Sequence, residues 1–274
     1  MPEYCPYDQP GSHYVTDPSA TTTLLLALAG FGAGWVDAVV GGGGLIQLPA
    51  LVLGFPNASP VQILATNKVS SICGTSTSSI TYYRRIKPDL RTAIPMAFVA
   101  FLGSLGGAAI GSHIPKSAFN PIILAVLIGV GAYTVFKPQL GVETALRFSG
   151  HRHLLAAGCT GAAVGLYDGA LGPGTGSFFV FLLVGLLGYG FLEASAKAKI
   201  ANFATNLAAL VIFIPQGAVM WKIGLLIGGC NLLGGYLGAR TAVAKGAEFV
   251  RVIFIVVVSA FILKIGADVI GQWW

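Results

Sequence analysis

Long apolar stretches separated by short polar stretches run along the chain, and the whole set occurs twice. In the first half they cover roughly residues 22–40, 45–55, 60–83, 92–112 and 119–137, and in the second half 154–171, 177–187, 194–214, 222–240 and 250–272. None alternates apolar and polar residues with a period of two, so the pattern predicts helices rather than strands. Most of the stretches approach the length of about 20 residues that a helix needs to cross a bilayer.

The second stretch of each half is too short for a full crossing. A helix over 45–55 or 177–187 extends only about 16 Å, whereas the hydrocarbon core is about 30 Å thick. Each is preceded by a glycine-rich run, GGGG at 41–44 and GPGTG at 172–176, which suits a tight reversal. We predict that the first two segments of each half form a re-entrant hairpin or a broken helix pair, with two full spans as the alternative.

The two halves are copies offset by 131 residues without a gap. The offset aligns two acids, two lysines and several glycines, in the pairs Gly30/Gly161, Gly34/Gly165, Asp37/Asp168, Gly41/Gly172, Gly43/Gly174, Gly54/Gly185, Lys68/Lys199, Gly103/Gly234 and Gly107/Gly238. Repeats with interrupted hydrophobic segments at matching positions are typical of secondary transporters. The expected regions are an extramembrane N-terminal tail (1–21), a first transmembrane repeat (22–137), a basic cytoplasmic linker (138–153) and a second repeat (154–274).

Composition narrows the class of protein. Of the 274 residues, 55% are hydrophobic and 9% are charged, whereas a soluble domain has about 25% charged residues. The chain is therefore expected to be an integral, all-α membrane protein. Its net charge of +6 is explained by loop cations, and no basic run interleaved with aromatic residues indicates a nucleic-acid partner. The four cysteines form no CxxC pair, and no HExxH, Ser–Lys or Cys–His pattern occurs, so we expect no metal, no cofactor and no enzyme activity.

Loop charges predict how the two repeats are oriented. If each repeat is a returning hairpin followed by three spans, eleven cations lie on one side of the membrane and two on the other. If each hairpin is instead one continuous span, the split is eight against five. Cations concentrate on the cytoplasmic side, so we predict inverted-topology repeats, each with a hairpin and three helices, and both termini extracytoplasmic.

Two acids, Asp37 and Asp168, precede the glycine runs by four residues. A charged side chain within the bilayer costs roughly 3 kcal/mol on insertion scales unless it is paired. Each acid is interpreted either as a proton-coupling carboxylate or as a structural cap for the following short helix. Both roles remain open.

Glycine backbones and lysines together indicate anion binding. The runs lack Walker spacing, so a nucleotide site is excluded, but bare N–H groups at the start of a helix favour an anion. Lys68 and Lys199 are expected near the runs, about a pseudo-twofold axis. The candidate binding residues are Gly42, Gly43, Gly44, Asn67, Lys68, Gly174, Thr175, Gly176, Lys199 and Asn202. Asn67 aligns with Ala198, and Ser71 with Asn202, so the site is expected to be asymmetric.

The stretches GWVDAVVGGGGLIQLPAL with ATNK, and GLYDGALGPGTGSFFV with AKAKIANFATN, resemble the sulfite exporter TauE/SafE family of bacterial permeases. The resemblance covers residues 20–272 and places Asp37, Lys68, Asp168 and Lys199 on motif positions. It implies transport of sulfite or organosulfonates such as sulfoacetate.

The predicted function is a secondary transporter of such anions in the inner membrane, an exporter, with proton coupling as a further hypothesis. An anion channel and an uptake permease are the alternatives, and a homodimer is left open.

Overall fold

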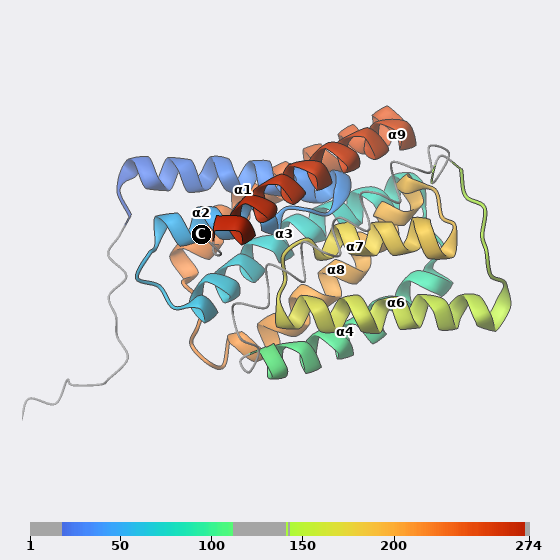
Figure 1. The fold of residues 1–274 in the computed structure, drawn as a ribbon, viewed down its shortest axis with the longest axis horizontal. Coiled ribbons are helices and arrows are strands. Elements are labelled where there is room, and N and C mark those ends of the chain that lie inside the picture. Colours follow the sequence, from blue (N-terminus) through green and yellow to red (C-terminus); the bar gives the residue numbers. More distant parts are fainter. Residues whose placement is uncertain (1–17, 112–140, 142, 272–274) are drawn as a thin grey trace, which may run out of the picture.

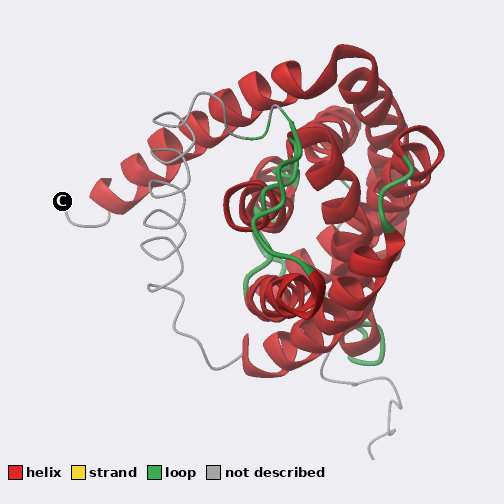
Figure 2. Cartoon of the chain, turned by 90° about the vertical axis from the view of Figure 1, so that its right-hand side faces the viewer, coloured by secondary structure: helices red, strands yellow, loops and turns green. Residues whose placement is uncertain are grey.

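The computed structural model describes residues 18–111, 141 and 143–271. Within these residues every regular element is helical and no strand occurs (Figure 2), which confirms the all-α prediction. The elements are α1 (Ala20–Val40), α2 (Gly44–Gly54), α3 (Pro60–Ile86), α4 (Leu90–Gly111), α6 (Gly150–Ala170), α7 (Thr175–Leu182), the π-helix η2 (Leu183–Leu187), α8 (Phe191–Phe213) and α9 (Trp221–Gly271). The predicted segment 119–137 and most of the predicted tail lie outside the described residues.

Local sequence signals explain where several helices begin and end. α3 starts with a capping box in which Ser59 and Gln62 bond each other's backbone N–H groups, and Pro60 occupies the first turn. α6 begins at Gly150, four residues before the apolar stretch that predicted it, because its first turn is polar. α9 is interrupted at Gly246 (φ 82°, ψ −175°). Its two halves correspond to the separate predicted segments 222–240 and 250–272.

Among the described residues, four helices are long and apolar enough to cross a membrane: Ala20–Val40, Leu90–Ala109, Phe191–Phe213 and the stretch Trp221–Lys264. The helices over Gly44–Gly54 and Thr175–Leu187 are apolar but shorter, as the hairpin prediction requires. α3 was predicted from an apolar stretch, yet it carries many polar side chains. Its 27 residues extend about 40 Å, and seven of its polar residues, including Thr66, Asn67 and Lys68, are buried within the bundle.

Each short helix folds back along the helix before it. A side chain at Gly43 would touch Ala33 and Asp37 of α1, and one at Gly54 would touch Leu26 near the other end of α1. In the second half, α7 returns beside α6, and the Tyr167 and Phe178 rings pack edge to face with centroids 4.9 Å apart. α1–α2 and α6–α7–η2 are therefore helical hairpins (Figure 1).

The first helix of each repeat packs against the fourth segment of the other repeat. Gly30 and Gly34 of α1 face Ile227 and Asn231 of α9. The same contacts recur with the 131-residue offset, since Gly161 faces Met96 and Gly165 faces Ala100 of α4. The aligned glycines allow these helices to approach closely, as small residues do in membrane proteins. Gly103 and Gly107 pack on α6, and Gly234 and Gly238 pack on α1.

The order of these contacts along each helix shows its direction. Residue numbers rise together in α1, α3 and the first half of α9. Gly30 and Gly34 of α1 face Ile227 and Asn231, and Val69 and Gly74 of α3 lie beside Gly224 and Gly235. α8 runs the other way, because Ser195 contacts Val39 and Lys199 contacts Asp37. In Figure 1, α1 runs from left to right and its repeat equivalent α6 from right to left.

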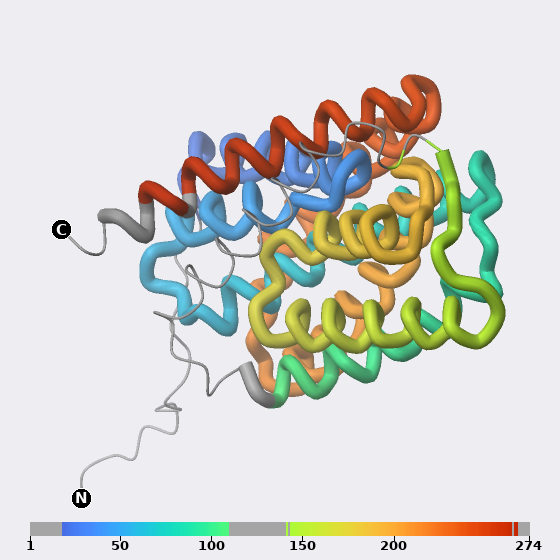
Figure 3. The backbone as a smooth tube through the Cα atoms, turned by 45° about the vertical axis from the view of Figure 1, so that its right-hand side comes forward, coloured from blue at the N-terminus to red at the C-terminus, as the bar shows by residue number. Residues whose placement is uncertain are grey.

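The main apolar core extends from the end of α1 along α7 and η2 to the start of α8. Buried residues of α7, η2 and the start of α8 contact the second half of α9, where the Phe191 and Phe254 rings pack at 5.6 Å. The second half of α9 crosses over this region (Figure 3). The two glycine-rich turns are thus enclosed by helices from both repeats.

Candidate functional site

The two glycine-rich turns, Gly41–Gly44 (the first tip) and Gly172–Gly176 (the second tip), touch each other. The Ser177 N–H donates to the Gly41 carbonyl at 2.8 Å. A Cβ at Gly176 would lie 2.5 Å from the Gly41 Cα, so only glycines allow this approach. Gly41 and Gly172 also have φ values of +85° and +86°, a left-handed backbone that glycine adopts without strain.

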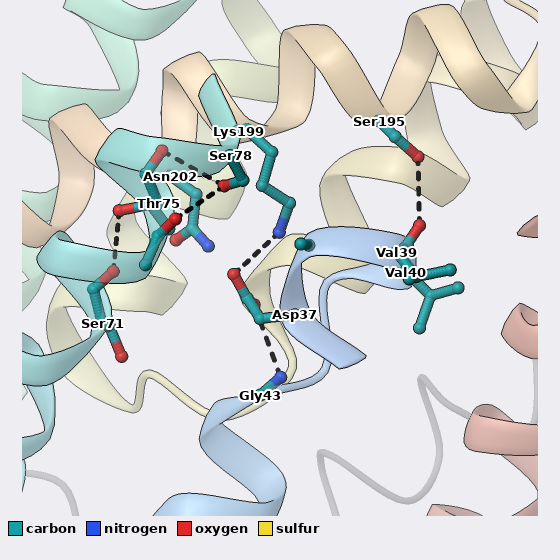
Figure 4. A network of polar contacts seen from close by, with 12 residues as sticks. Asp37, Val39, Val40, Gly43, Ser71, Thr75, Ser78, Ser195, Lys199 and Asn202 are labelled. Carbon is teal, nitrogen blue, oxygen red and sulfur yellow. Dashed lines mark hydrogen bonds and ion pairs between the residues drawn. The ribbon is translucent and has the colours of Figure 1, made fainter. Parts of the chain in front are cut away.

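Two buried ion pairs flank the tips, and each joins one repeat to the other. Lys199 Nζ lies 2.9 Å from Asp37 Oδ2, and Lys68 Nζ lies 2.7 Å from Asp168 Oδ2. Figure 4 shows Lys199 reaching from its helix toward Asp37 beside the first tip. The side chains of Lys68 and Asp168 are 4% and 1% exposed. The sequence placed both lysines near the tips; the structure adds that the aspartate of the opposite repeat pairs with each one.

The second oxygen of each carboxylate contacts the start of a short helix. Asp37 Oδ1 accepts a hydrogen bond from the N–H of Gly43, the N-cap residue of α2, at 3.4 Å. Asp168 Oδ1 accepts one from the hydroxyl of Thr175, the first residue of α7, at 2.6 Å. A carboxylate at a helix N-terminus is favoured by the helix dipole. Each aspartate therefore combines the capping position with an ion pair.

The charges of the two ion pairs cancel, because each lysine pairs with one aspartate. A lysine ammonium can donate three hydrogen bonds and accepts none, and in the described residues each of these two donates to a single carboxylate. Pairing offsets much of the cost of burying these charges, whereas removing one partner from such a pair costs about 3–5 kcal/mol. An anion that reaches Lys68 or Lys199 must compete with Asp168 or Asp37 for the ammonium.

The other predicted binding residues lie at different places around the tips. Gly44 is close to the Asn67 amide and to Gly172, and Gly174 is close to Leu45. Asn67 and Asn202 are buried; Asn67 Oδ1 has no hydrogen-bond partner among the described residues, and Asn202 accepts from Thr205. Gly42 instead faces Phe261 of α9, so its contacts are with apolar packing rather than with the ion pairs.

A buried polar cluster that we did not select from the sequence lies on the side of the first repeat. Gln47 Oε1 accepts hydrogen bonds from the Ser70 hydroxyl at 3.1 Å and from Asn231 Nδ2 at 2.8 Å. Gln47 is 0% exposed, and its Nε2 has no partner among the described residues. The available signal was an amide side chain inside an apolar segment, which is expensive in lipid and commonly functional.

Donors from three helices bond the carbonyl groups at the end of α1. The Tyr82 hydroxyl donates to Ala38 at 3.0 Å, and the Ser177 hydroxyl donates to Val40 at 3.0 Å. Ser195 donates to Val39 at 3.5 Å (Figure 4). A helix end leaves carbonyls without intrahelical partners, and in a membrane these must be bonded within the protein. The first tip is therefore held by side chains of α3, α7 and α8.

A third buried lysine lies on α8, two residues before Lys199. Lys197 Nζ donates to the Asp89 carbonyl at 2.9 Å and lies 3.4 Å from Glu193. Burial opposes ionisation of the Asp89 carboxyl, but hydrogen bonds from the Thr92 hydroxyl and the Arg91 N–H outweigh that effect and lower the pKa of Asp89. Lys197, one of the eleven cations on the cation-rich side, lies within α8 and ties the start of α8 to the start of α4.

Comparison with known proteins identifies the group to which this arrangement belongs. Residues 26–265 match the family described as sulfite exporter TauE/SafE. A probable membrane transporter protein, ORF9 of Sinorhizobium sp, is 37% identical over 89% of this chain and 92% of its own. A probable membrane transporter protein of Haemophilus influenzae is 35% identical over 91% and 95%.

The probable membrane transporter protein YfcA of Escherichia coli strain K12 is 35% identical over 88% of both chains. No solved structure matches the chain. The family comprises membrane transporters and is not a class of enzymes. With a family match over most of its length and several apolar helices, the chain is a multi-pass membrane transporter that belongs to the sulfite exporter TauE/SafE family.

Proposed function

We propose that the protein exports small sulfur-containing anions, such as sulfite or organosulfonates like sulfoacetate, across the bacterial inner membrane. The observation that carries the proposal is the pair of buried lysine–aspartate contacts, Lys68–Asp168 and Lys199–Asp37, beside two touching glycine tips. The family description supplies the sulfur anion. The geometry supports the proposal with two buried ammonium groups, each paired with an aspartate, beside the starts of two short helices.

In this proposal the anion replaces a carboxylate on a lysine ammonium. Sulfite and sulfonates present three oxygens on one sulfur, so one anion accepts hydrogen bonds from several donors at once. The binding groups are Lys68 and Lys199, the amides of Asn67 and Asn202, and the tip residues Gly43, Gly44 and Gly174–Gly176. The starts of α2 and α7 add positive dipole ends.

We further propose that the two repeats have inverted topology and alternate access by rocking about the tips. The opposite directions of α1 and α6 support this (Figure 1), as do the recurring contacts that lock the first helix of each repeat to the other repeat. Inverted repeats around a midplane site are a common basis for alternating access. The cation-rich ends would then face the cytoplasm, with both termini extracytoplasmic.

Export direction follows from the charge of the substrate. An inside-negative membrane potential drives an anion outward with about 2.3 kcal/mol per charge per 100 mV, so no further driving force is required.

Asp37 and Asp168 are the proposed proton-coupling groups, because each loses its ammonium partner when an anion binds. If transport is coupled to protons, a transmembrane pH gradient changes the rate of anion flux. An anion flux that is the same with and without the gradient would exclude proton coupling.

The test is anion flux in proteoliposomes that contain the purified full chain. Lys68→Ala and Lys199→Ala are expected to lose sulfite or sulfoacetate flux. The neutral double variant Lys68→Gln with Asp168→Asn replaces the pair by hydrogen-bonding groups, so it separates loss of charge from loss of folding. Lys197→Met is the matched control: it removes an equally buried lysine of the same helix that bonds Asp89 and Glu193, and it should keep transporting.

Full flux in both lysine variants would overturn the proposal. Flux without saturation or trans-stimulation would indicate an anion channel. Flux that proceeds only inward under a physiological potential would indicate an uptake permease.

A further inference from the structure

A cationic groove lies between the end of α3 and the first half of α9, away from the ion pairs. It has a volume of about 290 Å³ and is lined by Thr77, Ile80, Thr81, Arg84, Arg85, Tyr236 and Arg240. The lining contains three arginines and no acidic residue. Arg240 Nη1 donates to the Tyr236 hydroxyl at 3.0 Å, and its guanidinium lies over the Tyr236 ring, so Tyr236 orients one of the three charges.

The groove lies at the boundary between an apolar and a charged surface. On the same helices, Ile80 is 51% exposed and Leu233 is 56% exposed, as expected for side chains that contact lipid tails. Arg84 and Arg85 follow in the last turn of α3. Amphipathic residues and cations at such a boundary meet the headgroup region of a bilayer.

The positions that the 131-residue offset aligns with the groove carry neither the arginines nor the tyrosine. The 131-residue offset aligns Arg84, Arg85 and Arg240 with Pro215, Gln216 and Ala109. It aligns Tyr236 with Leu105, and Thr77 and Thr81 with Ala208 and Ile212. The three charges and the aromatic residue are therefore confined to one end of the molecule rather than inherited by both repeats.

We propose that this groove binds the phosphate headgroup of an anionic phospholipid, such as phosphatidylglycerol, in one leaflet only. Arginine is suited to a phosphate because its planar donors bond two oxygens at once. Arg84, Arg85 and Arg240 contact the phosphate, the Thr77 and Tyr236 side chains line the headgroup, and the acyl chains follow the exposed apolar surface of α3 and α9. A lipid bound there connects α3 of the first repeat to α9 of the second, so it stabilises the contact between them.

The test measures binding of short-chain phosphatidylglycerol to the full chain by native mass spectrometry, with phosphatidylcholine as the neutral lipid. The wild type is expected to retain phosphatidylglycerol selectively. Apparent affinity should fall about fivefold for each arginine removed in the series leading to Arg84→Gln, Arg85→Gln and Arg240→Gln. The matched control carries Lys87→Gln, Arg91→Gln and Lys245→Gln, three exposed cations outside the groove lining.

The outcomes separate a specific site from general electrostatic attraction. Equal losses in the groove and control variants, or wild-type binding in the groove variant, would overturn the proposal. Displacement of the lipid by inorganic phosphate alone would show that the groove takes the free anion instead. If the triple groove variant does not fold, Arg240→Gln and Tyr236→Phe keep most of the charge and should still weaken phosphatidylglycerol binding relative to the control.

Discussion

The two tips occupy equivalent positions in the repeats, yet they are held in different ways. The carbonyls at the end of α1 accept hydrogen bonds from Tyr82, Ser177 and Ser195, which belong to three other helices. The second tip is bonded by nearby residues, since Tyr167 donates to Pro173 and Thr175 donates to Gly172. The repeat equivalents of Tyr82, Ser177 and Ser195 are Phe213, Ile46 and Leu64, whose side chains cannot donate a hydrogen bond.

The buried residues next to the tips are also more polar on the side of the first repeat. Gln47, Ser70 and Asn231 form a buried hydrogen-bonded cluster on the side of the first repeat. Their equivalents on the other side are Phe178, Ala201 and Ala100. The duplication therefore kept the ion pairs and the packing glycines, which both repeats need to interlock. It diverged in the neighbouring polar groups, which determine how each half is held.

The largest difference between the repeats should come from breaking the two ion pairs singly. Lys68→Ala leaves Asp168, whose side chain is 1% exposed, without its cation, and we expect a loss of about 3–5 kcal/mol. Lys199→Ala leaves Asp37, which is 15% exposed and is hydrated more easily, so the loss should be smaller. Thermal unfolding of the purified variants in one detergent measures the order.

The double variant Lys68→Gln with Asp168→Asn serves as the control for that comparison. It leaves no unpaired charge, so it should unfold closer to the wild type than Lys68→Ala does. Equal destabilisation by Lys68→Ala and Lys199→Ala would show that the difference in exposure has no energetic consequence.

A smaller effect should separate the equivalent glycines Gly41 and Gly172. An alanine at either position pays about 1–2 kcal/mol for a left-handed backbone. Gly41→Ala also overlaps the backbone of Gly176, whereas the nearest atom to a Cβ at Gly172 is Lys68 Nζ at 3.6 Å. We expect Gly41→Ala to lower the unfolding temperature clearly more than Gly172→Ala does.

Gly217→Ala isolates the backbone contribution in this experiment. Gly217 has φ +65° and nothing within 4 Å of its Cβ position. Its alanine variant should therefore resemble Gly172→Ala in stability. If Gly41→Ala resembles it as well, the contact between the tips is looser than the structure shows.

Much of this arrangement was predictable, for identifiable reasons. The short helices α2 and α7 followed from apolar stretches after glycine runs, and the depth of Lys68 and Lys199 followed from their equal distance to those runs. The partner of each lysine did not follow, because spacing within a copy does not show which copy supplies the contact. The Gln47 cluster was also missed, since its members come from three separate segments and meet only after folding.

The polar cluster provides the finest test of the difference between the repeats. Gln47→Leu removes the acceptor of Asn231 and Ser70, and a buried donor left without a partner costs about 1–3 kcal/mol. Combining it with Ser70→Ala and Asn231→Ala copies the apolar chemistry of the second repeat, so stability should return toward that of the wild type.

Anion flux of this triple variant should nevertheless fall several-fold, because Gln47 Nε2 is a buried donor with no partner among the described residues and is available to a substrate oxygen. Phe178→Leu, the equivalent change in the second repeat, should leave flux intact. A triple variant that is both stable and fully active would reduce the cluster to helix packing, and the difference between the repeats would then concern folding rather than transport.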